Sequence, residues 1–354
     1  MRGRKSSIRP AKAGPCGVSG LGRLCSFLVL CLATAPVAAN DSTAGLGAGG
    51  LVLTKTADID MRAEDLSIST RQIRVRYRFF NTSKHDIATQ VAFPLPDLVY
   101  KDQDSSIDIP NSDGDNFLGF VTRVNGMAVK MQLEQKAMAK DIDHSALLRQ
   151  LGLPLSFYTD AAHKALQALP KPRWDELVAL GLAEIVEFDE GKGMEKTLQA
   201  RWLLKSTYHW EQVFPAQREI AIEHTYKPSV SSKVETQVGG SDWKEDPAGA
   251  EYFKNYCIDA KILTLLAKAH AKDKSSNSPF AEERIDYILT TGANWAAPIG
   301  VFRLVIDKGS VANLTSVCGT GWKAISPTRF ELRKRNFTPT EDFHMLIFKL
   351  RETG

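Results

Sequence analysis

Three arginines at alternate positions, Arg74, Arg76 and Arg78, have the type and spacing to bind an anion. Alternate side chains of a strand point to the same face, and a guanidinium donates paired hydrogen bonds to phosphate or carboxylate oxygens. The plainer interpretation is a solvated strand face on which these arginines pair with acids of another strand, such as Glu219 and Glu223. Both interpretations place the three arginines on one exposed face of a strand.

Tryptophan is the second residue type with a binding chemistry, because the flat face of an indole ring can stack on a sugar. Most of the six tryptophans should lie in the core of a β protein of this size. Trp243 differs, since it lies in the polar segment 229–250, and we expect it to be exposed. A glycan-binding site would therefore combine Trp243 with the arginines.

An acidic segment, 102–116, holds enough carboxylates and amides to suggest calcium, with Asp113 and Asp115 as the candidate ligands. A loop of the EF-hand type built around Gly114 would need an acid at position 109, where Ile109 stands. Hard cations need converging carboxylates rather than merely many of them, so a solvated turn is the better interpretation. The sequence therefore predicts no metal site.

The motifs of several common enzyme classes do not occur in the sequence. These are the serine motif G-x-S-x-G, the phosphate-binding loop G-x-x-x-x-G-K-[ST] and the zinc motif H-E-x-x-H. His224 follows Glu223 directly, but adjacent strand residues point to opposite faces. For the pair His209 and Glu211, as for the other histidines, we favour ordinary hydrogen-bonded or solvated side chains. The sequence predicts no catalytic residue and no cofactor, and an enzyme of an unfamiliar class is the weaker alternative.

Alternating hydrophobicity predicts the strands that position these residues. Residues 73–79 alternate between apolar side chains and the three arginines, which is typical of a half-buried strand. Residues 117–133 are typical of a hairpin, because Asn125 and Gly126 favour the positive φ angles of a tight turn. Other strands are predicted at 87–93, 198–210, 219–226, 284–290, 301–306, 328–332 and 343–350.

Helical spacing replaces the β pattern between about residues 134 and 187. Leucines recur there at three-residue steps, with Pro172 near one helix start and Gly181 near its end. A further helix is predicted at 259–271, with Asp259 as its cap. These patterns indicate short helices inserted into a β protein.

The first 39 residues have the composition of a signal peptide. They contain six basic and no acidic residues, and their apolar run of about 12 residues is shorter than the roughly 20 that a membrane-spanning helix needs. Small residues before Asn40 predict cleavage after Ala39. A lipoprotein would instead be acylated at Cys31, but Leu30 stands where a small residue is needed.

Removal of this segment changes the charge and the cysteine content. Six of the 45 basic residues leave, so 39 remain against 41 acidic residues, and nothing global favours nucleic acid. Cys257 and Cys318 are the two cysteines that remain, and in an oxidising compartment they are most simply a disulfide. A redox or metal-binding pair is the alternative, but no C-x-x-C occurs. No later apolar stretch is long enough to anchor the chain in a membrane.

Several stretches resemble the bacterial domain of unknown function family 4424. They include NDSTAGLGAGGLVLTKTADIDMRAEDLSIS, RVRYRFFNTSKHDIATQVAFPLPD, WEQVFPA and TTGANWAAPIGVFRLVIDKG. This resemblance covers most of the chain after residue 39 and implies neither a reaction nor a ligand. Residues 77–142 also resemble the vault protein inter-alpha-trypsin domain, a β-sandwich module for protein contacts, which implies a non-enzymatic scaffold.

These observations predict a mainly β protein, an antiparallel β-sandwich with an inserted helical segment and a second β-rich C-terminal part. We expect an exported envelope protein, periplasmic or secreted, that binds another envelope protein through its loops and inserted helices. A glycan or peptidoglycan binder is the alternative. The expected parts are a signal peptide at 1–39, a sandwich domain at 40–228 with its helical insertion at about 134–187, a loop or linker at 229–250 and a C-terminal helix with strands at 251–354.

Overall fold

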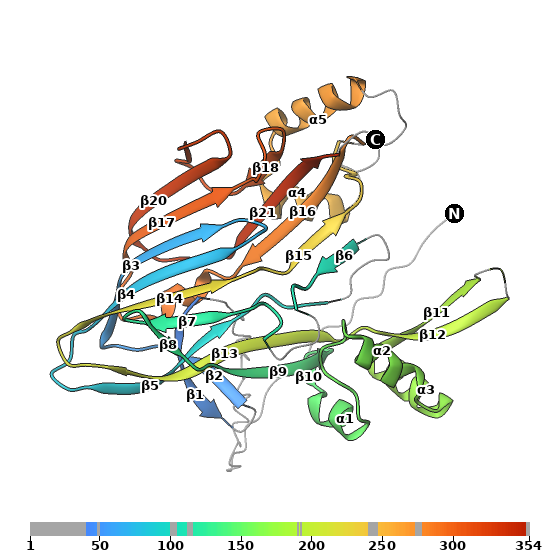
Figure 1. Cartoon of the computed structure of the whole chain (residues 1–354), viewed down its shortest axis with the longest axis horizontal. Coiled ribbons are helices and arrows are strands. Elements are labelled where there is room, and N and C mark those ends of the chain that lie inside the picture. Colours follow the sequence, from blue (N-terminus) through green and yellow to red (C-terminus); the bar gives the residue numbers. More distant parts are fainter. Residues whose placement is uncertain are drawn as a thin grey trace, which may run out of the picture. The chain divides into compact units, whose positions relative to one another are not determined.

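The computed structural model is mainly β, as predicted, with several antiparallel sheets and few helices (Figure 1). It describes residues 40–351 except 48–49, 100–104, 112–115, 190, 192, 240–246 and 273–277. The predicted signal peptide lies outside the described residues, as do Trp243, Asp113 and Asp115.

The largest sheet has eight strands, and two strands from distant parts of the chain meet at its centre. β3 and β17 pair in parallel and lie side by side in Figure 1, whereas the other neighbours are antiparallel. Gly300 permits this pairing, because a Cβ there would lie 2.7 Å from the Arg62 carbonyl oxygen. In sheet order the strands are β19 (Lys323–Ala324), β20 (Arg329–Phe337), β17 (Ile299–Asp307), β3 (Ile59–Ile68), β4 (Ile73–Asn81), β14 (Glu219–Tyr226), β7 (Val121–Val124) and β8 (Met127–Val129).

Two further sheets have six and five strands. The six-stranded sheet runs β10 (Ile142–Asp143), β9 (Gln132–Ala139), β13 (Leu203–Phe214), β5 (Ile87–Pro94), β1 (Ser42–Gly47) and β2 (Gly50–Thr54). The five-stranded sheet runs β18 (Leu314–Val317), β21 (Phe343–Leu350), β16 (Phe280–Tyr287), β15 (Val230–Lys233) and β6 (Ser105–Asp108). A separate hairpin consists of β11 (Ala183–Asp189) and β12 (Met194–Ala200).

Apolar faces of these sheets share one core. The predicted alternation in β4 is confirmed, because Ile73, Val75, Tyr77 and Phe79 are fully buried and the arginines between them are not. Phe79 packs edge-on against Phe214 of β13, with ring centroids 5.9 Å apart. The eight-stranded and six-stranded sheets thus bury their inner faces against one another, as in a sandwich.

The β7–β8 hairpin forms at the predicted turn. Asn125 and Gly126 have φ angles of 49° and 84°, which are the positive values that a tight primed turn requires. The Asn125 side chain also accepts a hydrogen bond from the Ala221 backbone at 2.9 Å, which ties the turn to the neighbouring strand β14.

The inserted helices occupy a shorter segment than 134–187. Residues 132–139 form β9, because β13 pairs along them, and residues 183–189 form β11. Gly181 ends the last inserted helix with a φ of 77°, and Trp174 and Leu177 are buried. The three helices between these strands are α1 (Ser145–Gln150), α2 (Asp160–Gln167) and α3 (Lys171–Leu180).

The remaining helices begin at the end of the polar segment 229–250, and residues near the start of that segment form the strand β15. As predicted, Asp259 caps a helix, since its carboxylate accepts a hydrogen bond from the Ile262 backbone at 2.8 Å. These elements are α4 (Pro247–Tyr256), α5 (Ala260–Lys272) and the short 3-10 helix η1 (Thr290–Asn294).

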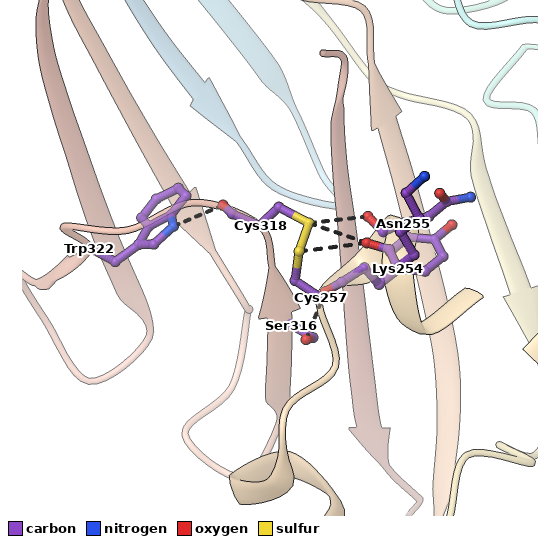
Figure 2. The surroundings of a disulfide bond; sticks show 7 residues. Lys254, Asn255, Cys257, Ser316, Cys318 and Trp322 are labelled. Atoms are coloured by element: carbon purple, nitrogen blue, oxygen red, sulfur yellow. Dashed lines mark hydrogen bonds between the residues drawn. A yellow bond between two sulfur atoms is a disulfide. The ribbon is translucent and has the colours of Figure 1, made fainter. Parts of the chain in front are cut away.

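Cys257 and Cys318 form a disulfide, as predicted (Figure 2). The bond connects the end of α4 to the end of β18, and the two Cα atoms lie 5.1 Å apart. Nearby, Ser316 donates a hydrogen bond to the Tyr256 carbonyl at 2.9 Å. The disulfide therefore fastens the helical segment after β15 to the edge of the five-stranded sheet.

Removing the disulfide should lower stability, because it closes a loop of 61 residues in the unfolded chain. We expect Cys257→Ala with Cys318→Ala to reduce the free energy of unfolding by up to about 4 kcal/mol, measured by denaturant titration. The same loss should follow reduction of the unsubstituted protein. Alkylation of both thiols in the denatured protein, isolated without a reductant, would contradict the bond.

Candidate functional site

The three predicted arginines lie on the outer face of the eight-stranded sheet, where further arginines join them. Cross-strand pairing places Arg303 opposite Asp65, Asp65 opposite Arg76, and Arg76 opposite Glu223. The same row continues to residues at both ends of the sheet, Arg333 on β20 and Arg123 on β7.

Acids pair with many of these arginines, as the plainer interpretation predicted. Glu223 accepts hydrogen bonds from Arg74 at 3.0 Å and from Arg76 at 2.6 Å, whereas Arg78 lies 3.7 Å from Glu219. Burial alone would raise the pKa of Glu223, but the bonds from Arg76 and Arg74 outweigh it and lower that pKa. Arg74 and Arg76 are thus engaged within the sheet.

A second acid of this face is held in the same way. Hydrogen bonds from Arg333 and Arg303 lower the pKa of Glu331 to about 2. Arg303 also donates to Asp65, at 2.9 Å. Between Arg303 and Arg123 the cations and anions of the row alternate. Glu331 bonds to both Arg303 and Arg333, which are cross-strand neighbours.

A cleft of about 630 Å³ opens on this face, and we call it the arginine cleft. Its lining includes five arginines against three acids, the half-buried Asp65 and Glu223 and the buried Glu64. Arg123 bonds only weakly to its own turn, at 3.4 Å from the Gly126 carbonyl. Positive charge therefore exceeds negative charge in the lining. The arginines are Arg76, Arg78, Arg123, Arg303 and Arg333.

The described tryptophans do not add a sugar-binding surface. Four are buried in the core and one is partly buried against it, which agrees with the prediction that most are core residues. They are Trp174, Trp202, Trp210, Trp295 and the partly buried Trp322.

A larger cavity, of about 1410 Å³, lies between the inserted segment and the five-stranded sheet, and we call it the main groove. Residues of α2 and β12 line one side, and residues of β6, β15, β16 and β21 line the other. Apolar side chains such as Leu98, Ile107 and Leu166 contribute to the lining. Both signs of charge are also present, for example at Asp160 and Lys233.

Sequence reasoning missed a cluster of ionisable side chains inside the core, which we call the buried polar centre. It consists of Asp41, Glu64, Tyr77, His224 and Tyr287, all at most 1% exposed. His224 lies 3.0 Å from Asp41, and the Tyr77 and Tyr287 hydroxyls lie 3.2 Å apart. No local pattern signals this cluster, because the neighbouring Glu223 points to the outer face and the partners of His224 come from distant parts of the chain.

Two members of this centre, His224 and Asp41, form with the neighbouring Thr122 the composition of a nucleophilic triad. The Thr122 hydroxyl lies 2.9 Å from Nδ1 of His224, whose Nε2 lies 3.0 Å from Asp41. Thr122 is 1% exposed and the other two are fully buried, so a substrate has no path to the hydroxyl. The arrangement therefore serves packing and hydrogen bonding rather than acyl transfer.

Glu64 is held in an unusual environment. Burial raises the pKa of Glu64 to about 8, and the hydrogen bond from the Asn40 amide opposes this rise only in part. Burial also raises the pKa of Asp41, and the interaction with His224 opposes this rise only in part. One oxygen of each carboxylate, Glu64 Oε1 and Asp41 Oδ2, has no hydrogen-bond partner within the described part of the chain.

Two other kinds of site find no support in the described residues. No group of three or more His, Cys, Asp or Glu side chains there could hold a metal ion. Gly45, Gly47 and Gly50 match the letters G-x-G-x-x-G of nucleotide-binding loops, but Gly47 on β1 pairs with Gly50 on β2, so the motif leads from a strand to a strand and not to a helix. No helix among the described residues has the length and apolar character to cross a membrane.

Comparison with known families gives a match over residues 39–346 to the domain of unknown function DUF4424. The chain belongs to this family. No curated protein matches this DUF4424 chain. The match covers the strands of all three large sheets up to the last one, so the sandwich and its C-terminal strands fall within a single family model.

Two solved structures show how far its likeness to known folds extends. A candidate nutrient-binding protein of Legionella pneumophila is 15% identical, with a TM-score of 0.40 over 87% of this chain and 72% of that chain. An M1 zinc metallopeptidase of Deinococcus radiodurans is 8% identical, with a TM-score of 0.22 over 84% of this chain and 44% of that chain.

Glu64 should make stability depend on pH in a chain that retains residues ahead of Asn40. Above about pH 5 the unfolded chain has lost the Glu64 proton, while the folded chain keeps it until about pH 8. Folding then takes up a proton, so stability should fall by roughly 3–5 kcal/mol as pH rises through this window. Denaturant titrations should show that Glu64→Gln flattens the slope and that Glu282→Gln, at a buried glutamate elsewhere, does not.

Proposed function

We propose that this DUF4424 protein is exported to the bacterial envelope and acts there by binding rather than by catalysis. The basic start, the short apolar run and the small residues before Asn40 support export with cleavage after Ala39. The Cys257–Cys318 disulfide supports an oxidising compartment, since such bonds persist outside the cytosol.

The main groove is the proposed contact site, and its lining is the observation that carries this proposal. A polypeptide offers apolar side chains together with charges of both signs, and the groove offers apolar residues beside Asp160, Lys233 and Lys349. A cavity of about 1410 Å³ has room for several side chains of a partner. We therefore propose that another envelope protein docks here.

The inserted helices support the same proposal. α2 contributes Thr159, Asp160 and His163 to one side of the groove, so the insertion adds a wall that the sandwich by itself lacks. Variable segments on a rigid sandwich commonly carry recognition. The resemblance of residues 77–142 to the vault protein inter-alpha-trypsin domain, a module for protein contacts, agrees with this role.

An anionic glycan at the arginine cleft is the second candidate function. The surplus of arginine over acid in the cleft favours it, because guanidinium groups recognise carboxylates and phosphates in pairs. Arg78 and Arg123 are the cations best placed to meet a ligand, since among the five lining arginines their contacts within the protein are the longest.

Photo-crosslinking from three exposed valines separates the two candidates. Val234 lines the main groove, Val301 lines the arginine cleft and Val311 lines neither, and all three are at least 42% exposed. We expect a photoreactive phenylalanine analogue at 234, introduced into the exported protein in intact cells, to capture one dominant protein. The analogue at 311 should capture none, because Val311 lines neither the main groove nor the arginine cleft.

Each result of this experiment has a different consequence. Capture at 301 alone would replace the groove with the arginine cleft. Equal labelling from 234 and 311 would contradict the docking site, because contact would then be non-specific.

The arginine cleft makes a separate prediction about polyanions. Arg78→Gln with Arg123→Gln should weaken binding of an anionic polysaccharide about tenfold at low salt, because each exposed contact contributes about 0.5–1 kcal/mol. The matched pair Arg71→Gln with Arg329→Gln removes the same charge outside the cleft and should change little. Equal losses in the two pairs, measured by calorimetry, would show only general charge attraction.

A further inference from the structure

The chain is buried at the point where the predicted mature protein begins. Asn40, Asp41 and Ser42 are fully buried, and Thr43 is 4% exposed. Chain ends usually lie at the surface, where polar groups meet water. Four consecutive polar residues in the core therefore need partners in the protein.

Asn40 lies in a pocket whose residues hydrogen-bond to the polar atoms of both its backbone and its side chain. Its backbone nitrogen donates to the Thr291 hydroxyl, and its side-chain amide donates to Glu64 Oε2 at 3.0 Å. Its side-chain oxygen accepts hydrogen bonds from Tyr77 and from the Asp41 backbone. Gly292 shapes the wall, since a Cβ there would lie 2.8 Å from the Asn40 amide nitrogen.

Negative charge in this pocket exceeds the positive charge available to it. Glu64 and Asp41 are buried carboxylates that each carry one oxygen without a partner among the described residues. The groups that face them are the hydroxyls of Tyr77 and Tyr287 and the imidazole of His224. His224 is the one side chain in this set that can carry a positive charge, and it bonds to Asp41. A buried carboxylate without a counter-charge is costly.

We propose that this pocket binds the α-ammonium group of Asn40 that cleavage after Ala39 creates, with Glu64 as its counter-charge. The inference rests on the proposed export and cleavage. Hydrolysis of the Ala39–Asn40 bond by a signal peptidase consumes one water and leaves a carboxylate on Ala39 and an ammonium on Asn40. The peptide nitrogen has one N–H to donate, whereas the ammonium has three and carries a charge.

Cleavage would thereby complete the contact between three sheets. Asn40 leads directly into β1 of the six-stranded sheet, Glu64 and Tyr77 belong to the eight-stranded sheet, and Tyr287 ends β16 of the five-stranded sheet. Trp295 also donates a hydrogen bond to the Asp41 carbonyl at 2.7 Å, next to the pocket. Cleavage of the precursor would therefore also fix the three sheets in place against one another.

Amine labelling of the exported protein tests this directly. Mass spectrometry of the purified protein gives its first residue, and a brief pulse of an acylating reagent then reports the reactivity of the α-amine. We expect Asn40 first, with an α-amine that reacts at least about 100-fold more slowly in the folded than in the unfolded chain. Exposed Lys55 of the same molecules is the internal control and should react at similar rates in both states.

Two variants show whether Glu64 holds the amine. Glu64→Gln should restore labelling of the α-amine, whereas Glu282→Gln, which alters a buried glutamate bonded to Thr236 and Tyr252, should not. A chain that retains Ala39 in front of Asn40 should be less stable than the chain that begins at Asn40. In that longer chain the nitrogen of Asn40 is an uncharged peptide nitrogen, so Glu64 has no ammonium partner to lose. Glu64→Gln should therefore cost less stability there than in the chain that begins at Asn40.

The outcomes distinguish the inference from the export on which it rests. A first residue of Asn40 with a freely reactive α-amine overturns the pocket and leaves export standing. A different first residue overturns the cleavage site and the pocket together. Protection that persists in Glu64→Gln would overturn Glu64 as the counter-charge.

Discussion

The buried contact of Asn40 and Asp41 with Glu64, His224 and Tyr77 is the constraint on which the three large sheets converge. Each partner comes from a different strand, and the Tyr77 hydroxyl extends the cluster to Tyr287 of a third sheet. Polar groups deep in a core are costly unless they are hydrogen-bonded, and these bonds link the three sheets, so the strands have little freedom to shift relative to one another. Apolar contacts such as Phe93 against Phe120 and His224 surround the cluster and exclude water from it.

The two binding surfaces follow from the same geometry. Because strand side chains alternate between faces, the residues that build the core from one side of β4 leave Arg74, Arg76 and Arg78 on the other. Neighbouring strands then align their own arginines and acids with these, which makes a charged face that is largely self-paired. The main groove has a different origin, because the chain leaves the sheet for the inserted helices and returns through β12 beside the five-stranded sheet.

Local pattern accounts for most of what could be predicted. The period of two in residues 73–79, the turn at Asn125–Gly126 and the cap at Asp259 are each decided by a few neighbouring residues, and all three are confirmed. The predicted helical character of residues 134–139 is wrong, because their pairing with β13, about 70 residues away in the sequence, outweighs local preference. The pairing of Arg74 and Arg76 with Glu223 could be anticipated, since both sides of that pair lie on recognisable strands.

The sequence by itself determined the mainly β class, the half-buried strand with its arginine face, the disulfide between the last two cysteines and the membership of the DUF4424 family. Only the tertiary structure decided that β3 pairs in parallel with β17, that α2 faces the five-stranded sheet across a groove, and that Glu64 lies against Asn40. The physical reason is the distance along the sequence over which each feature is decided. Alternation, turns and caps are read within a few residues, whereas the buried charges acquire their partners and their altered pKa values only when distant strands close over them.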